Sequence, residues 1–221
     1  MNNKNLIVIL SILGLFAFLF FAYKLTSTPQ KSVYPEVNVV KSTDHVKWSK
    51  DKKNILVEYS DLQCPACKSF HEVIKAQLEA TGPGKIDVTK SITFVYRHYP
   101  LLQIHANAQA AAYAAEAAGK QGKFYEYSDL LFTKQEEWST SGDPKSLFLN
   151  YADALKLDKE KFTKDMNSDE VRNKVAADVS SGDNAQVNAT PTFFLNGEKL
   201  NNLRSFEEFV QLLEKTAIGE K

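Results

Sequence analysis

The feature that most constrains the fold is an apolar strand that leads into two cysteines at the start of a helix. Residues 54–61 (NILVEYSD) have a continuous apolar centre, which is typical of a buried central strand. Cys64 and Cys67 follow, with Pro65 and Ala66 between them, and a helical pattern begins at Pro65. The chain has no other cysteine. A strand, a Cys-x-x-Cys turn and a helix in this order predict an α/β core.

The remaining pattern predicts that a helical segment interrupts this core. A second apolar strand is expected at residues 91–96, and the chain from 104 to about 181 has helical periodicity. A strand at 192–195, an Asn-Gly turn and a return strand at 198–200 follow, and Ser205 caps a final helix. We therefore expect a small α/β core with a helical insertion at about residues 103–184.

The position of the cysteine pair favours redox chemistry. The thiolate is the nucleophile of disulfide exchange, and the N-terminus of a helix stabilises negative charge. Cys64 would lie at that N-terminus, whereas Cys67, one turn later, would be more buried and would resolve mixed disulfides. Pro65 at the first helical position fixes the turn without losing a needed donor. We predict Cys64 as the nucleophile and Cys67 as the resolving thiol.

Other uses of the pair stay open at this point. A structural disulfide between Cys64 and Cys67 would close a very short loop and constrain the unfolded chain little. A structural zinc ion needs four ligands, and no second cysteine pair exists. His71 lies four residues after Cys67 on one helix face, so Cys64, Cys67 and His71 could together hold a metal ion such as copper. A lone Cys-x-x-Cys motif does not decide between these readings.

A second motif strengthens the redox interpretation. Pro191 stands immediately before the apolar strand at 192–195, an awkward place for an interior sheet ladder. Together with the cysteine pair after a strand, Thr190-Pro191 resembles the cis-proline loop that faces the cysteines in thioredoxin-fold proteins. In that fold the residue before the proline, here Thr190, offers its backbone groups to a substrate strand.

The chain resembles the DsbA-like branch of the thioredoxin superfamily, in particular the membrane-anchored BdbD-like group. The resemblance covers roughly residues 43–218. It is carried by residues 57–67 (VEYSDLQCPAC), 96–101 (YRHYPL), 105–124, Trp138 and 189–193 (ATPTF).

This resemblance implies a thioredoxin fold with a helical insertion and a thiol–disulfide oxidoreductase that introduces disulfide bonds into reduced exported proteins. It also implies recharging by a quinone-linked membrane thiol oxidase of the DsbB or BdbC kind. We expect no metal ion, and no cofactor beyond the redox-active Cys64–Cys67 disulfide.

Several residues are expected to support Cys64 and Cys67, namely Pro65, Ala66, Glu58, Thr190 and Pro191. Glu58 interrupts the apolar strand, and thioredoxin-fold enzymes often place a buried acid near the resolving cysteine to move its proton. Burial would raise the pKa of Glu58 toward the working range. The alternative is a carboxylate that faces solvent at an edge.

Other polar residues near the motifs have less defined roles. Asp61 would place a negative charge close to the cysteines, which disfavours the thiolate. His98 is expected to be structural, and His105 to cap or pack the helix that it begins.

A separate apolar segment precedes the α/β pattern. Residues 6–22 form a run of 17 residues without a charge. As a helix this run would be roughly 25 Å long, at the short end of a membrane span. Tyr23 and Lys24 follow as an interfacial anchor pair would, and no small-x-small cleavage site is apparent. We expect residues 1–25 to form a membrane anchor, with a cleaved signal peptide as the alternative. Residues 26–42 would form a linker, and residues 43–221 a domain outside the cytoplasm.

Composition argues against a nucleic-acid-binding protein. The 221 residues include 27 basic and 27 acidic side chains, so the formal charge is zero, and long basic runs are absent.

The cysteine pair and the resemblance make an oxidase of exported thiols the leading interpretation. A disulfide reductase or isomerase, a copper-binding protein that uses Cys64, Cys67 and His71, and a glutathione-using transferase of related fold are the alternatives.

Overall fold

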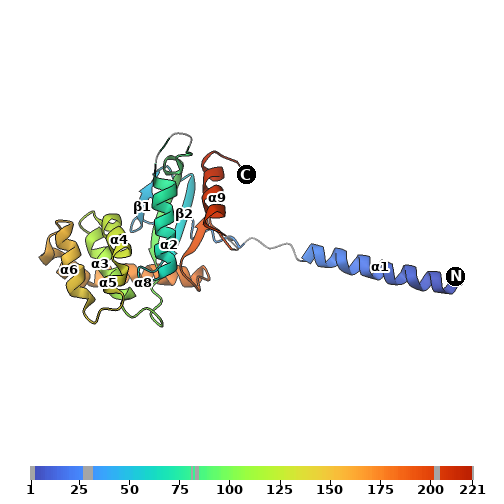
Figure 1. The fold of residues 1–221 in the computed structure, drawn as a ribbon, viewed down its shortest axis with the longest axis horizontal. Helices are drawn as coiled ribbons and strands as arrows, with labels where there is room; N and C mark the ends of the chain where they lie inside the picture. The colour runs from blue at the N-terminus through green and yellow to red at the C-terminus, as the bar shows by residue number, and fades with distance from the viewer. Residues whose placement is uncertain (1–2, 27–31, 81, 83–84, 202–204, 221) are drawn as a thin grey trace. The chain divides into compact units, whose positions relative to one another are not determined.

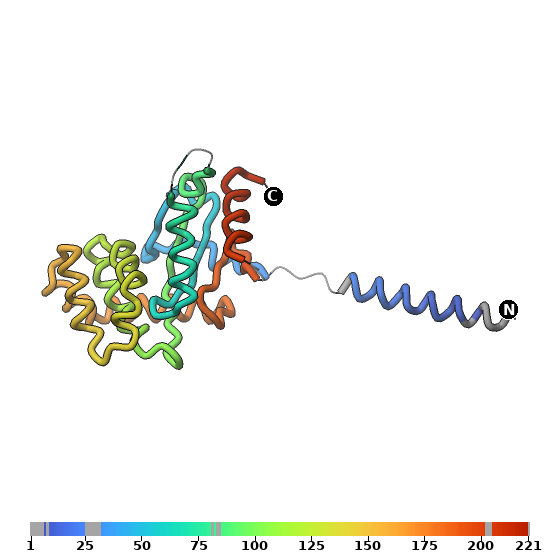
Figure 2. Tube along the Cα trace, viewed as in Figure 1, coloured from blue at the N-terminus to red at the C-terminus, as the bar shows by residue number. Residues whose placement is uncertain are grey.

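The computed structural model describes residues 3–26, 32–80, 82, 85–201 and 205–220. It divides into two compact units, Met1–Ser32 and Val33–Lys221. The first unit holds helix α1 (Asn3–Thr26), and the second holds all the other elements described below (Figures 1 and 2).

The predicted membrane anchor at residues 6–22 lies within α1. Among the residues that the structure describes, however, no helix has both the length and the apolar character needed to cross a membrane. The prediction of an N-terminal transmembrane helix is therefore not confirmed.

A five-stranded mixed sheet forms the centre of the second unit. Its strands lie in the order β1 (His45–Trp48), β3 (Ile92–His98), β2 (Asn54–Ser60), β4 (Thr192–Leu195) and β5 (Glu198–Lys199). β2 and β3 are parallel, and the other neighbouring pairs are antiparallel. The sequence predicted all of these strands except β1, which reads His-Val-Lys-Trp and lacks the apolar run of a buried strand.

Helices and one extended segment cover the two faces of the sheet. The first face carries α2 (Pro65–Val73), its π-helical continuation Ile74–Glu79, and α9 (Phe206–Ala217). Figure 1 shows α2 and α9 alongside the strands. A short 3-10 helix, Val88–Lys90, leads into β3 on the same side. The second face packs against residues that follow α8 (Asp169–Asn184) and against Val37. Burial on both faces explains why β2 and β3 are apolar without alternation.

The helical insertion lies between β3 and β4, as predicted. It consists of α3 (Ala108–Gly119), α4 (Phe124–Thr133), α5 (Gln135–Trp138), α6 (Pro144–Ala154), α7 (Lys159–Met166) and α8. Figure 2 shows the chain leaving the sheet into these helices and returning from α8 to β4. Most alanines of α3 are buried, and several of them lie in the core of the insertion, where small side chains let neighbouring helices approach closely. Trp138 is fully buried there, and its indole N–H donates to the carbonyl of Leu131 at 2.8 Å.

The prediction of a linker at residues 26–42 is wrong for its C-terminal part. Residues 27–31 lie outside the described residues. Val33 forms an isolated β-bridge with Glu198, and Val37 is fully buried against the sheet. The ring of Tyr34 meets that of Phe194 edge to face at 5.6 Å. The packed unit therefore begins at Val33, earlier than the predicted residue 43. This stretch is mostly polar in composition, but its few apolar side chains pack on the sheet.

A buried ion pair fastens this segment to the sheet. The guanidinium of Arg97 donates from Nε and Nη2 to the two carboxylate oxygens of Asp44, at 3.1 and 2.8 Å. Arg97 also donates to the carbonyls of Val37 and Val39 and to the hydroxyl of Tyr59. Both side chains of the ion pair are fully buried. A bidentate pair with every remaining donor satisfied is the arrangement in which a buried charge is tolerated.

We expect Asp44→Ala to lower the free energy of unfolding by about 3–5 kcal/mol, because it leaves the Arg97 guanidinium buried without its partner. Urea denaturation of the two proteins measures this difference. Asp153→Ala is the matched control, since Asp153 pairs with Lys159 at 3.2 Å but both side chains are more than half exposed. It should cost less than about 1 kcal/mol. Equal destabilisation by both variants would contradict the role assigned to Asp44.

Candidate active site

Cys64 and Cys67 lie at the N-terminus of α2, directly after the loop that follows β2. Cys64 is the N-cap residue, with extended backbone angles (φ −73°, ψ 124°), and Pro65 occupies the first turn. Both cysteines are free thiols. Cys64 is 7% exposed and Cys67 is fully buried, whereas Pro65 and Ala66 are exposed. The two thiols therefore differ in access, as the sequence predicted.

The Thr190-Pro191 loop lies against Cys64. Its peptide bond is cis, as the resemblance implies. The Cys64 thiol donates to the carbonyl of Thr190 at 3.4 Å, although 126 positions separate the two residues in sequence. The Thr190 hydroxyl is buried and has no hydrogen-bond partner among the described residues. It is free to donate to Cys64 once that thiol becomes a thiolate.

The surroundings of Cys64 favour its thiolate. A hydrogen bond from the thiol of Cys67 is the largest of the causes that lower the pKa of Cys64 to about 5. Burial opposes this shift, and the backbone N–H groups of Cys67 and Ala66 and the Thr190 hydroxyl, which can donate to the thiolate, add to it. These donors belong to the first turn of a helix and to the loop facing it, where negative charge is stabilised.

The surroundings of Cys67 favour its protonated thiol. Burial raises the pKa of Cys67 well above its ordinary value, and the hydrogen bond to Cys64 and the charge of Glu58 raise it further. The backbone N–H of Asp61 donates to the Cys67 sulfur at 3.5 Å and acts in the opposite direction. The pair therefore has one thiol suited to be a nucleophile or leaving group and another that holds a proton.

Glu58 lies within β2, between Tyr96 of β3 and Phe193 of β4. It is only 4% exposed, so the alternative of a solvent-facing carboxylate is wrong. Burial raises the pKa of Glu58 to about 7, against a weaker opposing hydrogen bond with Ser60. A carboxyl group with this pKa can take up and release a proton near neutral pH.

The helical insertion holds the cysteine loop through hydrogen bonds that sequence reasoning missed. The side-chain amide of Gln135 in α5 donates to the carbonyls of Leu62 and Cys64, at 2.8 and 3.1 Å. The amide of Gln63 donates to the carbonyl of Ser139 at 2.9 Å, and its oxygen accepts from the backbone N–H of Asn107. No local pattern in the sequence signals these contacts, because each joins segments far apart in the chain.

Asp61 organises the loops around the cysteines. Its buried carboxylate accepts from the backbone N–H groups of Gln63 and Leu101, both at 2.8 Å. Its Oδ2 also lies 2.7 Å from Nδ1 of His105. His105 therefore packs against the active-site loop, which extends the packing role predicted for it. His98, predicted as structural, lies 3.1 Å from the carboxylate of Glu116.

The structure does not bring His71 to the cysteines as a metal site requires. His71 Nε2 lies 3.3 Å from Oδ1 of Asp129, and its ring stacks on Phe132. Among the described residues, no group of three or more His, Cys, Asp or Glu side chains is placed to hold a metal ion. The copper-binding alternative receives no support from this geometry.

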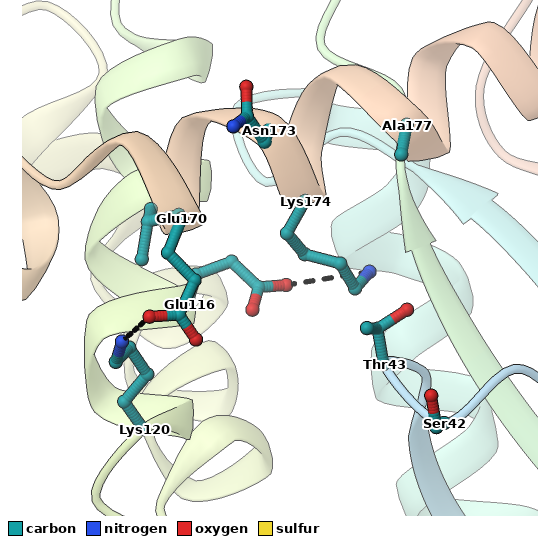
Figure 3. A pocket seen from close by; sticks show the side chains of 9 residues that line it. Ser42, Thr43, Glu116, Lys120, Glu170, Asn173, Lys174 and Ala177 are labelled. Atoms are coloured by element: carbon teal, nitrogen blue, oxygen red, sulfur yellow. Dashed lines mark hydrogen bonds and ion pairs between the residues drawn. The ribbon is translucent and has the colours of Figure 1, made fainter.

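A polar cavity of about 540 Å³ lies elsewhere, between α3, α8 and the segment that precedes β1 (Figure 3). Its charged side chains are paired with one another: Lys120 with Glu170, and Lys174 with Glu116 at 3.7 Å. Burial would raise the pKa of Glu116, but hydrogen bonds with His45 and His98 outweigh it and hold the pKa well below its usual value. The cavity therefore lies at a charged contact between the insertion and the segment that precedes β1, and neither cysteine lines it.

Comparison with known proteins agrees with this geometry. A family model described as thioredoxin matches residues 41–215. The chain belongs to the thioredoxin family. Within it, the helical insertion makes the fold DsbA-like, and the predicted thioredoxin fold of this kind is confirmed.

Several solved structures match most of the chain. BdbD from Bacillus subtilis, in its oxidised form, has a TM-score of 0.68 and 20% identity over 85% of this chain and 98% of its own. Wolbachia pipientis α-DsbA1 has a TM-score of 0.67 and 22% identity over 83% and 97%. MdbA of Corynebacterium diphtheriae, a thiol-disulfide oxidoreductase, has a TM-score of 0.60 and 21% identity over 86% and 98%. At 20–22% sequence identity, these matches show that the folds are similar.

Curated relatives with higher identity are much longer proteins. The Na(+)/H(+) antiporter NhaA 3 of Salinispora tropica is 38% identical over 156 residues, which is 71% of this chain and 22% of the antiporter. The Na(+)/H(+) antiporter NhaA 1 of Mycolicibacterium gilvum is 36% identical over 160 residues, 71% of this chain and 24% of that protein. The chain thus spans less than a quarter of these relatives, so the likeness concerns a segment of domain size.

The hydrogen bond from Cys67 predicts different Cys64 titrations in two variants. Cys67→Ala removes the donor and should raise the pKa of Cys64 above that of Cys67→Ser, which keeps a hydroxyl donor. The ultraviolet absorbance of the thiolate, followed against pH, measures both values, since Cys64 is then the single cysteine. In Cys67→Ser we expect a pKa well below the free-thiol value of roughly 8.5. Identical curves for the two variants would show that this hydrogen bond does not set the shift.

Proposed function

We propose that the protein is a thiol–disulfide oxidoreductase that introduces disulfide bonds into reduced exported proteins through Cys64 and Cys67. The observation that carries this proposal is the placement of the two thiols. Cys64 caps the N-terminus of α2 and contacts the Thr190-Pro191 loop, whereas Cys67, one turn later, is fully buried. No cofactor beyond the Cys64–Cys67 disulfide is needed, because the electron pair is held by the two sulfurs themselves.

The reaction begins with the oxidised enzyme. A substrate thiolate attacks Sγ of Cys64, the Cys64–Cys67 bond breaks, and a mixed disulfide forms between substrate and Cys64. Cys67 leaves as a thiolate and takes the proton of the Glu58 carboxyl group. The second substrate thiolate then attacks the substrate sulfur of the mixed disulfide. The substrate leaves with a disulfide, and the enzyme is reduced by two electrons with Cys64 as a thiolate.

The Thr190-Pro191 loop supplies the surface on which the substrate would lie. The Thr190 carbonyl already accepts from the Cys64 thiol, so it lies next to the sulfur that is attacked. An extended substrate could pair with backbone groups of this loop while its cysteine reacts. Pro65 and Ala66, which follow Cys64, are exposed, and Cys64 itself is 7% exposed.

The direction of electron flow follows from the stability of the reduced form. A low pKa of Cys64 makes its thiolate a good leaving group and stabilises the reduced enzyme, which makes the disulfide an oxidant. A reductase or isomerase is the second candidate, since the same two sulfurs perform the reverse reaction. Oxidation is favoured because several donors converge on Cys64.

We further propose that the domain works outside the cytoplasm, where thiol oxidation is sustained. The apolar run at residues 6–22 would direct this placement, and a quinone-linked membrane thiol oxidase would restore the disulfide. Protease accessibility of the domain in intact cells tests the placement. Loss of the reduced enzyme's reoxidation in cells without such an oxidase tests the partner.

The oxidase direction predicts a reduction potential less negative than the value of about −270 mV typical of thioredoxin. Equilibration in glutathione buffers, followed by quenching and counting of free thiols, measures this potential. The oxidised protein should also introduce disulfides into a reduced, unfolded ribonuclease at neutral pH. A potential at or below the thioredoxin value would instead identify a reductase, and Cys64→Ser should abolish either activity.

A role for Glu58 in moving the Cys67 proton predicts a slow and pH-insensitive Glu58→Gln variant. In the wild type, Cys67 must lose its proton to attack a Cys64–glutathione mixed disulfide. The rate of this attack should rise as pH increases through about 7, because only the Glu58 carboxylate accepts the proton. Glu58→Gln should be slower by about tenfold or more above that pH. Single-turnover release of glutathione measures the rate, and equal rates across pH would contradict this role.

A further inference from the structure

Glu58 can act in repeated turnovers only if its proton reaches solvent, yet the side chain is 4% exposed. This requirement rests on the function proposed above. The route must therefore pass through the groups packed around Glu58. On the sheet, its neighbours in register are Tyr96 and Phe193, of which only Tyr96 has a polar side chain.

A small cavity lies beside Glu58, between the sheet, α2 and α4. Its volume is about 20 Å³, and Tyr96, His71, Ser128 and Asp129 line it together with Glu58. A cavity needs about 10–15 Å³ and two to four polar partners to hold a water molecule. The size of this cavity therefore matches one water.

Four buried polar atoms at this cavity lack partners. The hydroxyls of Tyr96 and Ser128, Nε2 of His71 and Oδ1 of Asp129 find no hydrogen-bond partner among the described residues. Nε2 of His71 and Oδ1 of Asp129 lie 3.3 Å apart as a charge contact, without forming a hydrogen bond to each other. Tyr96 and Ser128 are each only 3% exposed. Buried polar groups in native proteins are almost always hydrogen-bonded to protein or water. Four unpaired atoms around one water-sized space are accounted for by a single bound water, which can both donate and accept.

The other titratable groups at the cavity are already paired. Lys47 Nζ lies 2.6 Å from Oε1 of Glu79, which also accepts from the indole of Trp48 at 3.0 Å. The Tyr125 hydroxyl donates to the backbone carbonyl of His45 at 2.7 Å. These groups do not compete for the water, so the unpaired atoms define its partners.

Asp129 connects the cavity to solvent. Its Oδ1 is buried at the cavity, whereas its Oδ2 accepts from the ammonium of Lys75 at 2.7 Å on the surface. The side chain as a whole is 26% exposed. His71, beside it, stays neutral at pH 7 because burial lowers its pKa to about 4. His71 can therefore orient a water without trapping a proton as a cation.

We propose that the cavity holds a water molecule that carries protons between Glu58 and Asp129, and so between the resolving thiol and solvent. When Cys67 attacks a mixed disulfide, the Glu58 carboxylate takes its proton. Protonated Glu58 then passes a proton to the water, which passes one of its own to the Asp129 carboxylate. Asp129 releases it at the surface, and Glu58 is a carboxylate again. When the enzyme is reduced by substrate, the same steps run in reverse.

Two variants interrupt this route at different points. Ser128→Val removes one partner of the water and fills its space, and Asp129→Asn leaves the space but cannot carry a proton. We expect each to slow the Cys67-dependent release of glutathione from the mixed disulfide by about tenfold, toward the rate of Glu58→Gln. Asp153→Asn, which changes an exposed aspartate paired with Lys159, is the matched control and should react at the wild-type rate.

A proton relay changes the rates of thiol–disulfide exchange but leaves its equilibrium unchanged, which distinguishes it from a structural role. It accelerates proton transfer in both directions, so Asp129→Asn should slow forward and reverse exchange by the same factor and keep the equilibrium with glutathione within about twofold. Imidazole buffer should restore the rate of Asp129→Asn by replacing the surface carboxylate, but it should not restore Glu58→Gln. A changed equilibrium without a changed rate would overturn the relay.

The rates of these variants distinguish a failure of the proton relay from a failure of the proposed oxidoreductase function. A slow Glu58→Gln with wild-type rates in both Ser128→Val and Asp129→Asn would overturn the relay and leave the oxidoreductase intact. The water itself is tested without any activity, by a crystal structure of the reduced full chain. A water within hydrogen-bond distance of Ser128 Oγ and Asp129 Oδ1 is expected, and a dry cavity would overturn the proposal even if the protein exchanges disulfides.

Discussion

The hydrogen bond from the Cys67 thiol to Cys64 is the contact on which the site depends. It lowers the pKa of the acceptor sulfur to about 5 and raises that of the donor, so the two thiols of one motif acquire opposite proton affinities. The contact exists because Cys64 caps α2 and Cys67 lies one turn inside it. Burial of Cys67 makes the difference larger, since the interior disfavours a second negative charge.

The rest of the fold holds this pair in place from three directions. β2 delivers the chain to the N-terminus of α2 and carries Glu58 beneath it. The Thr190-Pro191 loop approaches Cys64 from the start of β4. From the insertion, Gln135 binds the carbonyls on either side of Gln63. The insertion is therefore part of the active-site support as well as a separate packing unit.

The interior of the second unit contains several buried charged side chains, which are rare in a domain core unless they are paired. Glu58, Asp61 and the Arg97–Asp44 pair are all buried, and each has a distinct environment. Asp61 and Arg97 have their hydrogen-bonding groups satisfied by backbone and side chains, which suits structural roles. Glu58 instead borders a water-sized space with unpaired hydroxyls, which suits a group that must exchange a proton. The buried acids therefore differ in their hydrogen-bond partners and not in how deeply they are buried.

The sequence predicts the order of elements, the helical insertion and the placement of Cys64 and Cys67 at a helix N-terminus. It also indicated Glu58 and Thr190-Pro191 as neighbours of the pair. The order of elements and the helix start at the cysteines are encoded locally, because periodicity and turn residues report the burial of each element along its own length. The proximity of Glu58 and Thr190-Pro191 to the pair was implied only by the resemblance to thioredoxin-fold proteins. Other features became visible only in the folded chain: residues 33–40 pack on the sheet, Arg97 pairs with Asp44, and Ser128 and Asp129 line a cavity beside Glu58. Such contacts depend on which distant segments meet, as the 126 positions between Cys64 and Thr190 illustrate, and no local pattern specifies that choice.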